Sequence, residues 1–506
     1  NWTGSNMIEK ESLSNSALDD VKEPTDLREL YEEKPLFKGL KDYKGELLFG
    51  STLLILLYRW NLQPVNVILI VMLVFWSSIR LLSTTKLFSS NTELSGKSSR
   101  IRSVKITGLL LSVILTFLII SSLIFLNVSP QTGGDPVMFD SQNFEEGAFQ
   151  NLEEFSDGNS SWWGTLGEYM VSDSKRAPTT VLPTKEYQSL EPNGGEISIT
   201  WFGHSTILIE TANVTIITDP LFGEDNTDPL FFGPSPFPYQ HSYSLSELPK
   251  IDYVFISHDH YDHLDMDTIK ELSDSTFFVP LGVKSHLLRW GITDGQVSEL
   301  DWYEEANITD EFQVALTPAQ HFSGRGLGNM DSTLWGSWVF ELEHSTLYFS
   351  GDTGYMEEFK IIGERYGPFD IAFLESGQYD IAWKDVHMFP EEAIQAAIDL
   401  NAKSVLPIHN SKFELALHPW EEPLELVTSI GSRNNISVTT PMIGESFLLN
   451  QPHPDEEWWL NVSVETPSFL KTNPLVGVAL APLNLVGIVW IVTGRQAKRN
   501  LDDSEE

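Results

Sequence analysis

The feature that most constrains this chain is a run of histidines and aspartates directly after an apolar stretch. The stretch Tyr253-Val254-Phe255-Ile256-Ser257 has the composition of a buried strand. The next six residues, His258-Asp259-His260-Tyr261-Asp262-His263, hold three imidazoles and two carboxylates. Neutral imidazole suits zinc, and carboxylate oxygen suits zinc, manganese or iron. A solvated charged loop would favour Lys, Glu and Ser, so the run predicts most of a two-metal site.

The overall composition narrows the class of partner. The chain has 506 residues, a net charge of −39 and a pI of about 4.5. An acidic surface of this size repels phosphate backbones, which argues against nucleic acid as a partner. The sequence contains no cysteine, which excludes disulfides, a thiolate nucleophile and any cysteine-ligated metal. The metal ligands expected here are therefore imidazoles and carboxylates.

Apolar segments flank the central part of the sequence. Residues 1–45 are polar, acidic and rich in Ser, and we expect them to be disordered. Residues 46–128 contain apolar runs, and the longest, Ile106–Val128, has no charged residue. We predict two to three transmembrane helices there and one more at 474–494, before a charged tail at 495–506. The shorter runs could instead pack as core helices.

The placement of basic residues predicts an orientation for these segments. Lysines precede the first apolar run, basic residues fill the loop before Ile106, and others follow the C-terminal run. By the positive-inside rule, both termini would be cytoplasmic and the region between the spans would face outward. The acceptor triplets Asn-x-Ser/Thr agree, since they start at Asn127, Asn159, Asn213, Asn307, Asn435 and Asn461. The sequence thus predicts an integral membrane protein with an extracytoplasmic catalytic domain.

Between the apolar flanks, the sequence divides into a central domain and two linkers. Residues 129–175, which are rich in Gly, Asp, Asn and Ser, are predicted to be a linker, as are residues 451–473. From 176 to 450, apolar runs of strand length alternate with turns, and this range is the predicted catalytic domain. The segment Pro390–Leu400 begins with Pro and acidic residues, as helices do. Runs of strands with helices between them suggest packed sheets covered by helices.

Four residues outside the first run stand where a metal site could be completed. His321, Asp352 and His409 each follow an apolar strand, and His387 precedes the predicted helix. Each has an ordinary explanation when taken alone, because a lone His is often a surface residue and Gly-Asp-Thr-Gly favours a turn. Strand ends can share one edge of a sheet, however, so residues distant in sequence can converge there. We therefore predict that these residues join the first run.

Taken in order, the set resembles the metallo-β-lactamase superfamily. The matching residues are His258, His260, Asp262, His263, His321, Asp352 and His409. The resemblance implies an αββα sandwich, so the expected fold class is α/β, an αββα metallo-β-lactamase sandwich plus transmembrane helices. It implies two divalent cations, with zinc expected and manganese or iron as alternatives.

The same resemblance implies a role for each residue. One metal would be held by His258, His260 and His321. The other would be held by Asp262, His263 and His409. Asp352 would bridge the two ions together with a hydroxide, since a bridging carboxylate holds two cations close and each cation lowers the pKa of a shared water. His204 and Asp219 are expected to support the ligand loops.

A narrower resemblance is to phospholipase D enzymes that hydrolyse N-acylphosphatidylethanolamine, with the L-ascorbate-6-phosphate lactonase group as a more distant relation. The motifs that carry it are Trp201–Thr206, Thr218–Pro220, Glu247–Asp252, His258–Asp265, Glu299–Trp302, Leu334–Trp338, Ser350–Tyr355, Glu364–Asp370 and His387–Ala393. It implies that Asp262 and His387 are catalytic. Asp262 would orient the hydroxide, and His387 would contact a phosphate oxygen or protonate the leaving group.

Three functions are consistent with these residues. The first is a membrane-anchored phosphodiesterase whose partners are the membrane and a lipid or small amphiphilic phosphodiester. The second is a hydrolase of lactones or other small esters at the same dinuclear site. The third is a membrane sensor or binding module with an inert sandwich. A phosphodiester and lactone screen combined with metal analysis distinguishes them.

Overall fold

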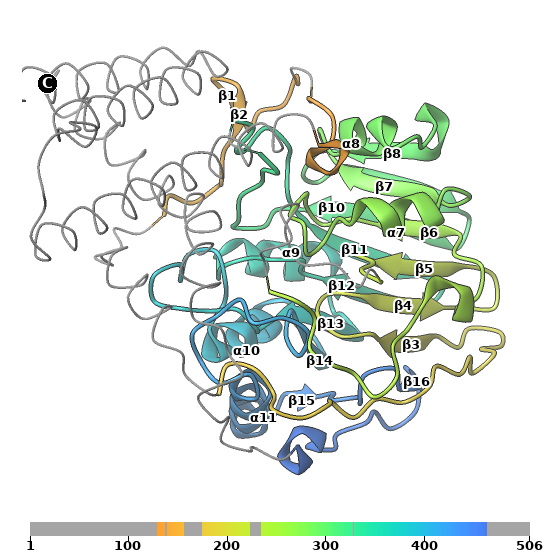
Figure 1. Ribbon diagram of the computed structural model, residues 1–506, viewed down its shortest axis with the longest axis vertical. Coiled ribbons are helices and arrows are strands. Elements are labelled where there is room, and N and C mark those ends of the chain that lie inside the picture. Colours follow the sequence, from red (N-terminus) through yellow and green to blue (C-terminus); the bar gives the residue numbers. More distant parts are fainter. Residues whose placement is uncertain (1–128, 137–138, 156–174, 223–233, 327, 463–506) are drawn as a thin grey trace, which may run out of the picture. The chain divides into compact units, whose positions relative to one another are not determined.

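Two sheets of strands form the centre of the structure. A computed structural model describes residues 129–136, 139–155, 175–222, 234–326 and 328–462, all within one compact unit (Figure 1). The first sheet has seven strands, in the spatial order β16 (Ser446–Leu448), β3 (Ser198–Trp201), β4 (Ile207–Glu210), β5 (Thr215–Thr218), β6 (Tyr253–Phe255), β7 (Thr276–Pro280) and β8 (Val297–Leu300). The strands β5 to β8 are parallel, whereas the neighbouring pairs from β16 to β5 are antiparallel.

The second sheet also has seven strands. In spatial order they are β15 (Ser437–Val438), β14 (Ser404–Ile408), β13 (Ile371–Glu375), β12 (Ser345–Phe349), β11 (Ser337–Leu342), β10 (Phe312–Thr317) and β9 (Glu305–Thr309). The strands β12 to β15 are parallel, and β11 is antiparallel to both β10 and β12. The strands β10, β12, β13 and β14 therefore all end at the same edge of the sheet.

Side chains alternate between an inner and an outer core along each strand. In β4, Ile209 belongs to the core between the sheets, whereas Leu208 belongs to the core on the outer face. In β13, Phe373 faces the inner core and Leu374 faces the outer one. This follows from the two-residue period of a strand, and it explains why these strands are apolar at consecutive positions.

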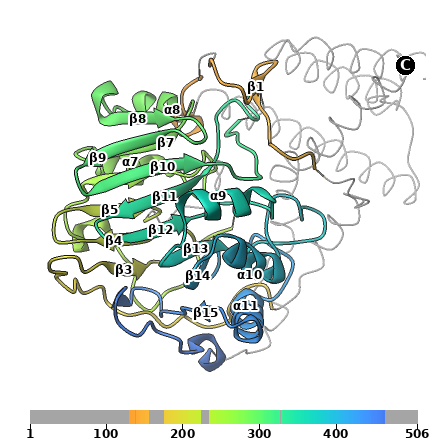
Figure 2. The same ribbon diagram turned by 180° about the vertical axis from the view of Figure 1, so that it is seen from behind.

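Helices cover both outer faces (Figure 1 and Figure 2). Ile269 and Leu287 pack on the first sheet, and Phe359 and Ala393 pack on the second. The helices involved are α7 (Met266–Glu271), α8 (Lys284–Arg289), α9 (Glu358–Tyr366) and α10 (Pro390–Asp399), with α11 (Glu422–Asn434) beside α10. The layers run helix, sheet, sheet, helix, so the predicted α/β sandwich is confirmed.

Parts of both predicted linkers pack on this sandwich. Residues 129–155 contribute the turn η1 (Pro130–Thr132) and the short strands β1 (Phe144–Glu145) and β2 (Ala148–Phe149). At the other end, the turn η4 (Trp458–Asn461) buries Trp458 and Trp459 in the core between the sheets.

The expectation of transmembrane helices, and with it that of an integral membrane protein with an outward-facing domain, is wrong for the described part of the chain. No helix there is long and apolar enough to cross a bilayer. The longest of them, α11, has 13 residues, whereas a span needs about 20. Only one face of α11 is apolar, and that face is used to pack on the rest of the sandwich. The segments at 46–128 and 474–494 lie outside the described residues.

Candidate metal centre

The candidate ligands follow strands that end at the same edge. His258 lies just beyond β6, His321 beyond β10, Asp352 beyond β12, and His409 directly after β14. Strands that run in one direction bring residues of distant sequence position together in this way. The structure brings together all seven residues for which metal ligation was predicted, in two groups, and within each group the ligand atoms lie within 4.8 Å of one another. The first group is His258, His260, His321 and Asp352, and the second is His204, Asp262, His263 and His409.

The first group contains three imidazoles that converge on one point. His258 Nε2 lies 2.8 Å from His260 Nδ1, and His321 Nε2 lies 3.3 Å from the same atom. Nitrogen ligands at 2.0–2.1 Å in a tetrahedral zinc site are about 3.3 Å apart. The spacing of these nitrogens is therefore close to that of a metal coordination shell.

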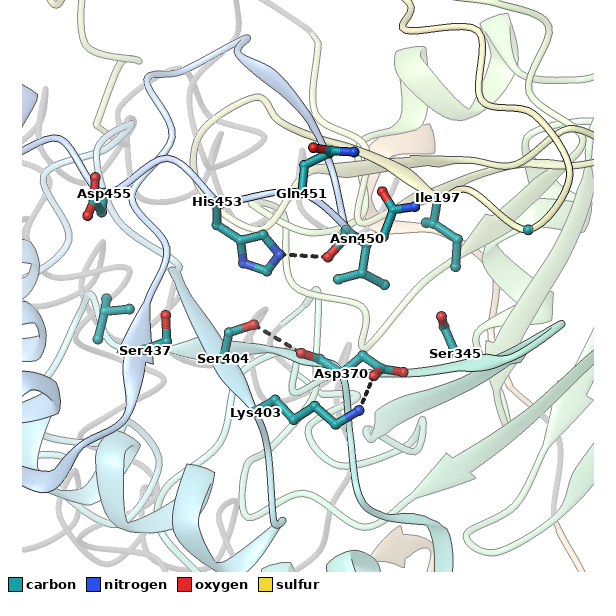
Figure 3. Close-up of a pocket in the computed structure, with 13 residues that line it drawn as sticks. Ile197, Ser345, Asp370, Lys403, Ser404, Ser437, Asn450, Gln451, His453 and Asp455 are labelled. Atoms are coloured by element: carbon teal, nitrogen blue, oxygen red, sulfur yellow. Dashed lines mark hydrogen bonds and ion pairs between the residues drawn. The ribbon is translucent and has the colours of Figure 1, made fainter.

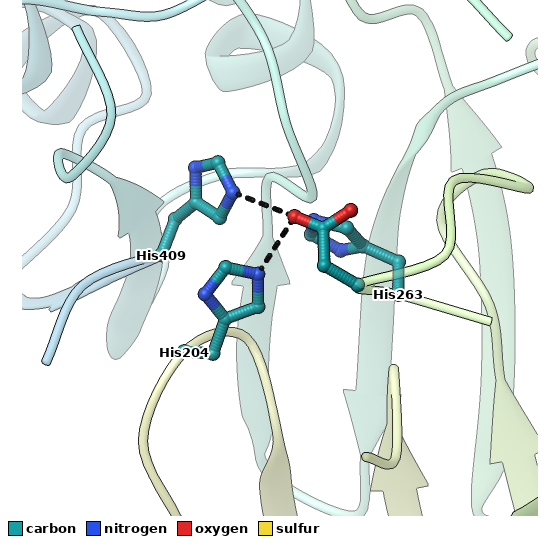
Figure 4. A group of neighbouring side chains, drawn as sticks. His204, His263 and His409 are labelled. Atoms are coloured by element: carbon teal, nitrogen blue, oxygen red, sulfur yellow. Dashed lines mark hydrogen bonds and ion pairs between the residues drawn. The ribbon is translucent and has the colours of Figure 1, made fainter. Parts of the chain in front are cut away.

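The second group contains one carboxylate, that of Asp262, and it lies against Asp352 of the first group. Asp352 Oδ2 lies 3.1 Å from His263 Nε2 and 3.2 Å from His409 Nε2. The same oxygen is 3.9 Å from His258 Nε2 and 3.8 Å from His321 Nε2, which places Asp352 between the two groups. Figure 4 shows the second group, in which His204 and His409 both point at the carboxylate of Asp262, beside His263.

Several buried atoms of this centre suit a cation. The nitrogens His263 Nε2 and His409 Nε2 and the oxygen Asp352 Oδ1 are buried and make no hydrogen bond among the described residues, although the two nitrogens lie 3.1 and 3.2 Å from Asp352 Oδ2. Buried polar atoms are rarely left unpaired, because each costs about 1–3 kcal/mol. Imidazole nitrogen and carboxylate oxygen are also the donors that zinc prefers in the absence of thiolates. The residues present thus fit divalent metal ions.

The imidazoles of the first group are in the neutral form that can donate a nitrogen lone pair to a metal. Burial holds the pKa of His258 and that of His321 well below the usual value, because the charged imidazolium would be desolvated. Burial likewise lowers the pKa of His260. These rings are neutral at physiological pH, and neutral imidazole is the form that binds a metal.

The second group has the opposite charge state when no metal is bound. Burial would lower the pKa of His409, but Asp352, Asp262 and Glu375 outweigh burial and raise it to about 10. Burial would raise the pKa of Asp352, but His263 and His409 outweigh that effect and hold it well below the usual value. Without a metal, protons supply the positive charge that these carboxylates require.

Supporting residues orient the ligand rings. Asp219 follows β5 and is buried, and its carboxylate accepts from His263 Nδ1 at 2.8 Å and from the backbone and hydroxyl of Ser257 at 2.7 and 2.6 Å. His204 Nε2 lies 3.1 Å from Asp262 Oδ2. These contacts leave the Nε2 atom of His263 facing the centre, as a carboxylate behind a metal-binding histidine does.

Local backbone geometry at the centre is unusual. His204, Asp219 and His409 have φ angles of +53°, +37° and +63°, in the left-handed region that non-glycine residues seldom adopt. The turn at His409 is also packed closely from behind. A Cβ atom on Gly377 would lie 1.7 Å from the carbonyl oxygen of His409, so only glycine fits there.

His387, predicted to be catalytic, reaches the same centre. Its Nδ1 lies 2.9 Å from both carboxylate oxygens of Glu375, the fully buried last residue of β13. Glu375 Oε1 is also 3.5 Å from His409 Nδ1, and Oε2 accepts from the backbone of Thr353 at 2.9 Å. Asp352, Glu375, His387 and His409 form a third group with ligand atoms within 4.8 Å.

Glu375 was not among the residues predicted from the sequence. A signal for it was present, because a single carboxylate follows the apolar run Ile371–Leu374 just as His409 follows the apolar end of β14. Glu is less conspicuous than His in such a position, since Glu is common after strands. Its burial and its contacts with two histidines become visible only in the fold.

A separate cavity of about 420 Å³ lies at the other edge of the sandwich (Figure 3). Its lining residues Ser404 and Ser437 begin β14 and β15, whereas the metal centre lies where such strands end. Lys403 Nζ pairs with Asp370 at 2.6 Å within it. None of the metal-binding groups found among the described residues lies in this cavity.

Known proteins share parts of this sequence. Residues 214–410 match the β-lactamase superfamily domain. The chain is 37% identical over 331 residues to an uncharacterized protein of Mycobacterium tuberculosis (strain H37Rv), covering 63% of this chain and 87% of that one. It is 35% identical over 267 residues to N-acyl-phosphatidylethanolamine-hydrolyzing phospholipase D 1 of Caenorhabditis elegans, covering 49% and 74%. The solved structure of Igni18, a metallo hydrolase from Ignicoccus hospitalis, is 26% identical with a TM-score of 0.40, covering 50% and 98%.

Proposed function

This chain belongs to the metallo-β-lactamase superfamily of metal-dependent hydrolases, and on that basis we propose that it hydrolyses a lipid or amphiphilic phosphodiester of the N-acylphosphatidylethanolamine type. The observation that carries the proposal is the pair of ligand groups joined through Asp352, with His387 at their edge. A relative with 35% identity over 74% of its length, named as a phospholipase D for this lipid, supports the choice of substrate.

Two divalent cations, which we propose to be zinc, would be held by the residues of the two groups. Bound cations at such a site supply the Lewis acidity that activates water and polarises the phosphoryl group. In the proposed reaction, an oxygen from water joins phosphorus, and the bond from phosphorus to the ethanolamine oxygen breaks. The leaving oxygen takes up one proton, so the products are a phosphatidic acid and an N-acylethanolamine.

The chain's own side chains position and protonate the reactants. His387 Nδ1 is engaged by Glu375, so Nε2 is the ring nitrogen left for the leaving oxygen. Asp262 lies between His204 and the metal ligands, where its carboxylate can orient a water. The low exposure of His258, His263, His321 and His409 excludes bulk water from the metal side of the centre.

The test is hydrolysis of N-acylphosphatidylethanolamine in detergent micelles by purified protein. We expect release of N-acylethanolamine after zinc is added to chelator-treated protein, and incorporation of ¹⁸O from labelled water into phosphatidic acid. Asp352→Asn should abolish turnover, because it removes the charge shared by both groups. Asp274→Asn is the matched control, since Asp274 is exposed on the surface and should leave turnover unchanged.

A panel of lactones is assayed in parallel with the phosphodiester. Zinc-loaded protein that opens lactones but cleaves no phosphodiester would overturn the proposed substrate class. Protein that retains lipid cleavage after Asp352→Asn would overturn the assignment of the reaction to this centre.

A further inference from the structure

A segment before the sandwich packs on the loops that carry the candidate ligands. We call residues 129–136 and 139–155 the N-terminal arm, which is orange in Figure 1, where η1 lies beside α8. Phe149 of the arm is fully buried in the core between the sheets, and its backbone N–H donates to Asp331 O at 2.7 Å. The ring of Phe149 also packs against Phe144 and Phe139, with centroids 4.8 and 5.5 Å away. The arm is therefore anchored on the catalytic domain.

Asn151 of the arm pairs with the backbone of a candidate ligand. Its Nδ2 donates to His321 O at 2.7 Å, and its Oδ1 accepts from His321 N at 3.1 Å. Trp335 Nε1 donates to the same Oδ1 at 3.1 Å, which fixes the orientation of the amide. One side chain thus satisfies both the donor and the acceptor of the His321 peptide units, which would otherwise need water or another partner.

These bonds determine where the His321 ring points. The backbone is held by Asn151, and the ring itself is held by Nδ1, which lies 3.0 Å from Val386 O. With those positions fixed, Nε2 faces His260 Nδ1 at 3.3 Å, inside the first group. The neighbouring residue is tied to the arm as well, because Gln320 Nε2 donates to Glu153 O at 2.8 Å.

A buried arginine, Arg325, connects the arm to the loop that carries His260 and His263. Arg325 Nη1 donates to Asp259 O at 2.6 Å and to Leu264 O at 2.8 Å, which bracket the run from His260 to His263. From its other side, Arg325 donates to Gln131 O of the arm, with Nε at 3.0 Å and Nη2 at 2.9 Å. Arg325 is only 3% exposed, so this bridge is protected from water.

We propose that the N-terminal arm is part of the metal site and that Asn151 is a positioning residue for His321. Loss of Asn151 weakens the first group, where His321 contributes a ligand atom, more than the second group. Residues outside the ligand set that orient a metal-binding histidine typically change affinity by about 10–100-fold when they are removed. The inference rests on the metal centre and is independent of which ester is hydrolysed.

The experiment measures metal affinity directly. Chelator-treated full-length protein is titrated with Zn²⁺ against a chromophoric chelator, and with Co²⁺ followed by its visible absorption. We expect two sites in the wild type. In Asn151→Ala, we expect one of the two to weaken by about 10–100-fold, with the other within threefold. Asn151→Asp keeps the acceptor that His321 N and Trp335 Nε1 use, but it places a carboxylate oxygen where Nδ2 donated to His321 O, so the same site should weaken in this variant as well.

Asn143→Ala is the matched control. Asn143 lies on the same arm, and its backbone carbonyl rather than its side chain accepts from Gln150 N at 2.8 Å. Two unchanged sites in Asn151→Ala would overturn the proposal, as would equal weakening of both sites. If Asn151→Ala does not fold, each site of Asn151→Asp is compared with the same site of the wild type. Two unchanged sites, or equal weakening of both, would then overturn the proposal. If the wild-type protein cleaves no phosphodiester but Asn151→Ala still loses one metal site selectively, only the proposed substrate is refuted.

Discussion

Both carboxylate oxygens of Glu375 lie 2.9 Å from Nδ1 of His387, at the edge of the metal centre. Glu375 is fully buried, and the backbone N–H of Thr353 donates to the same carboxylate at 2.9 Å. A buried carboxylate with these partners holds the His387 ring in one orientation, with Nδ1 facing Glu375. The second ring nitrogen is then directed away from Glu375, which leaves it for the contact with the leaving oxygen that we propose.

Replacing Glu375 with Gln should therefore impair turnover without removing a metal ligand from the two groups. An amide keeps one acceptor but loses the second carboxylate oxygen that holds the His387 ring, so we expect kcat to fall by about 10–100-fold. The measurement is steady-state hydrolysis at saturating zinc, with bound zinc quantified in the same samples. Glu391→Gln, on the exposed face of α10, is the control and should match wild type. A kcat within twofold of wild type for Glu375→Gln would contradict this role.

Metal binding should release protons. In the metal-free protein, the pKa of His409 is raised to about 10 by Asp352, Asp262 and Glu375 against the effect of burial, and that of His263 is also raised well above its usual value. Both rings carry a proton at pH 7.5 and must lose it to bind a cation, so affinity should rise with pH up to about 10. Calorimetric titration of chelator-treated protein with zinc, in buffers of different ionisation enthalpy, should show at least one proton released. Zero proton release at pH 7.5 would contradict these charge states.

The clustering of the candidate ligands could be predicted from the sequence because much of its signal is local. His258, His260, Asp262 and His263 fall within one short run after a strand, and His409 directly follows another strand. Strand direction then places such ends together, as the sandwich confirms. The order of these residues along the chain is itself enough to indicate the superfamily.

Residues that act through tertiary contacts gave no such signal. Asn151 lies in a stretch whose Gly, Asp, Asn and Ser content is typical of a linker, yet it bonds to the backbone of His321 across 170 positions. Arg325 likewise joins the arm to a ligand loop through backbone carbonyl oxygens. Every residue has such an oxygen, so the sequence gives no sign of which ones Arg325 contacts. Length and hydropathy predict membrane spans from apolar runs that lie outside the described residues, and no helix of the described ranges is long and apolar enough to cross a bilayer.

Adding a methyl group at Gly377 should disturb the centre from behind. The Cβ of Gly377→Ala would lie 1.7 Å from His409 O, so the turn that carries His409 must shift. Overpacking of this kind typically costs about 1–3 kcal/mol in the free energy of unfolding. Urea denaturation of chelator-treated protein measures that cost, and zinc titration should show weakened binding. Gly295→Ala, whose Cβ would meet nothing within 4 Å, is the control. Equal stability of the two variants would contradict the packing argument.

Lys412 is buried near the same turn with little to compensate its charge. The side chain is 7% exposed, and Nζ donates to the carbonyl of Leu221 at 2.5 Å. Burial lowers the pKa of Lys412 from 10.5 to about 8, although Asp265 partly opposes the shift. The folded protein thus carries a neutral amine above about pH 8, whereas the unfolded chain keeps its proton until higher pH.

The stability of the fold should therefore rise with pH in this window. Between about pH 8 and 10.5 the unfolded state binds more protons at Lys412 than the folded state does, so raising the pH favours folding. From pH 7.5 to 10 the contribution to the free energy of unfolding is about 2 kcal/mol. Urea denaturation should show wild type gaining that amount relative to Lys412→Met, which has no such proton to lose. Lys250→Met, at a side chain that is 76% exposed, should show no relative change. A constant difference between wild type and Lys412→Met across this range would mean that the amine is charged in the fold.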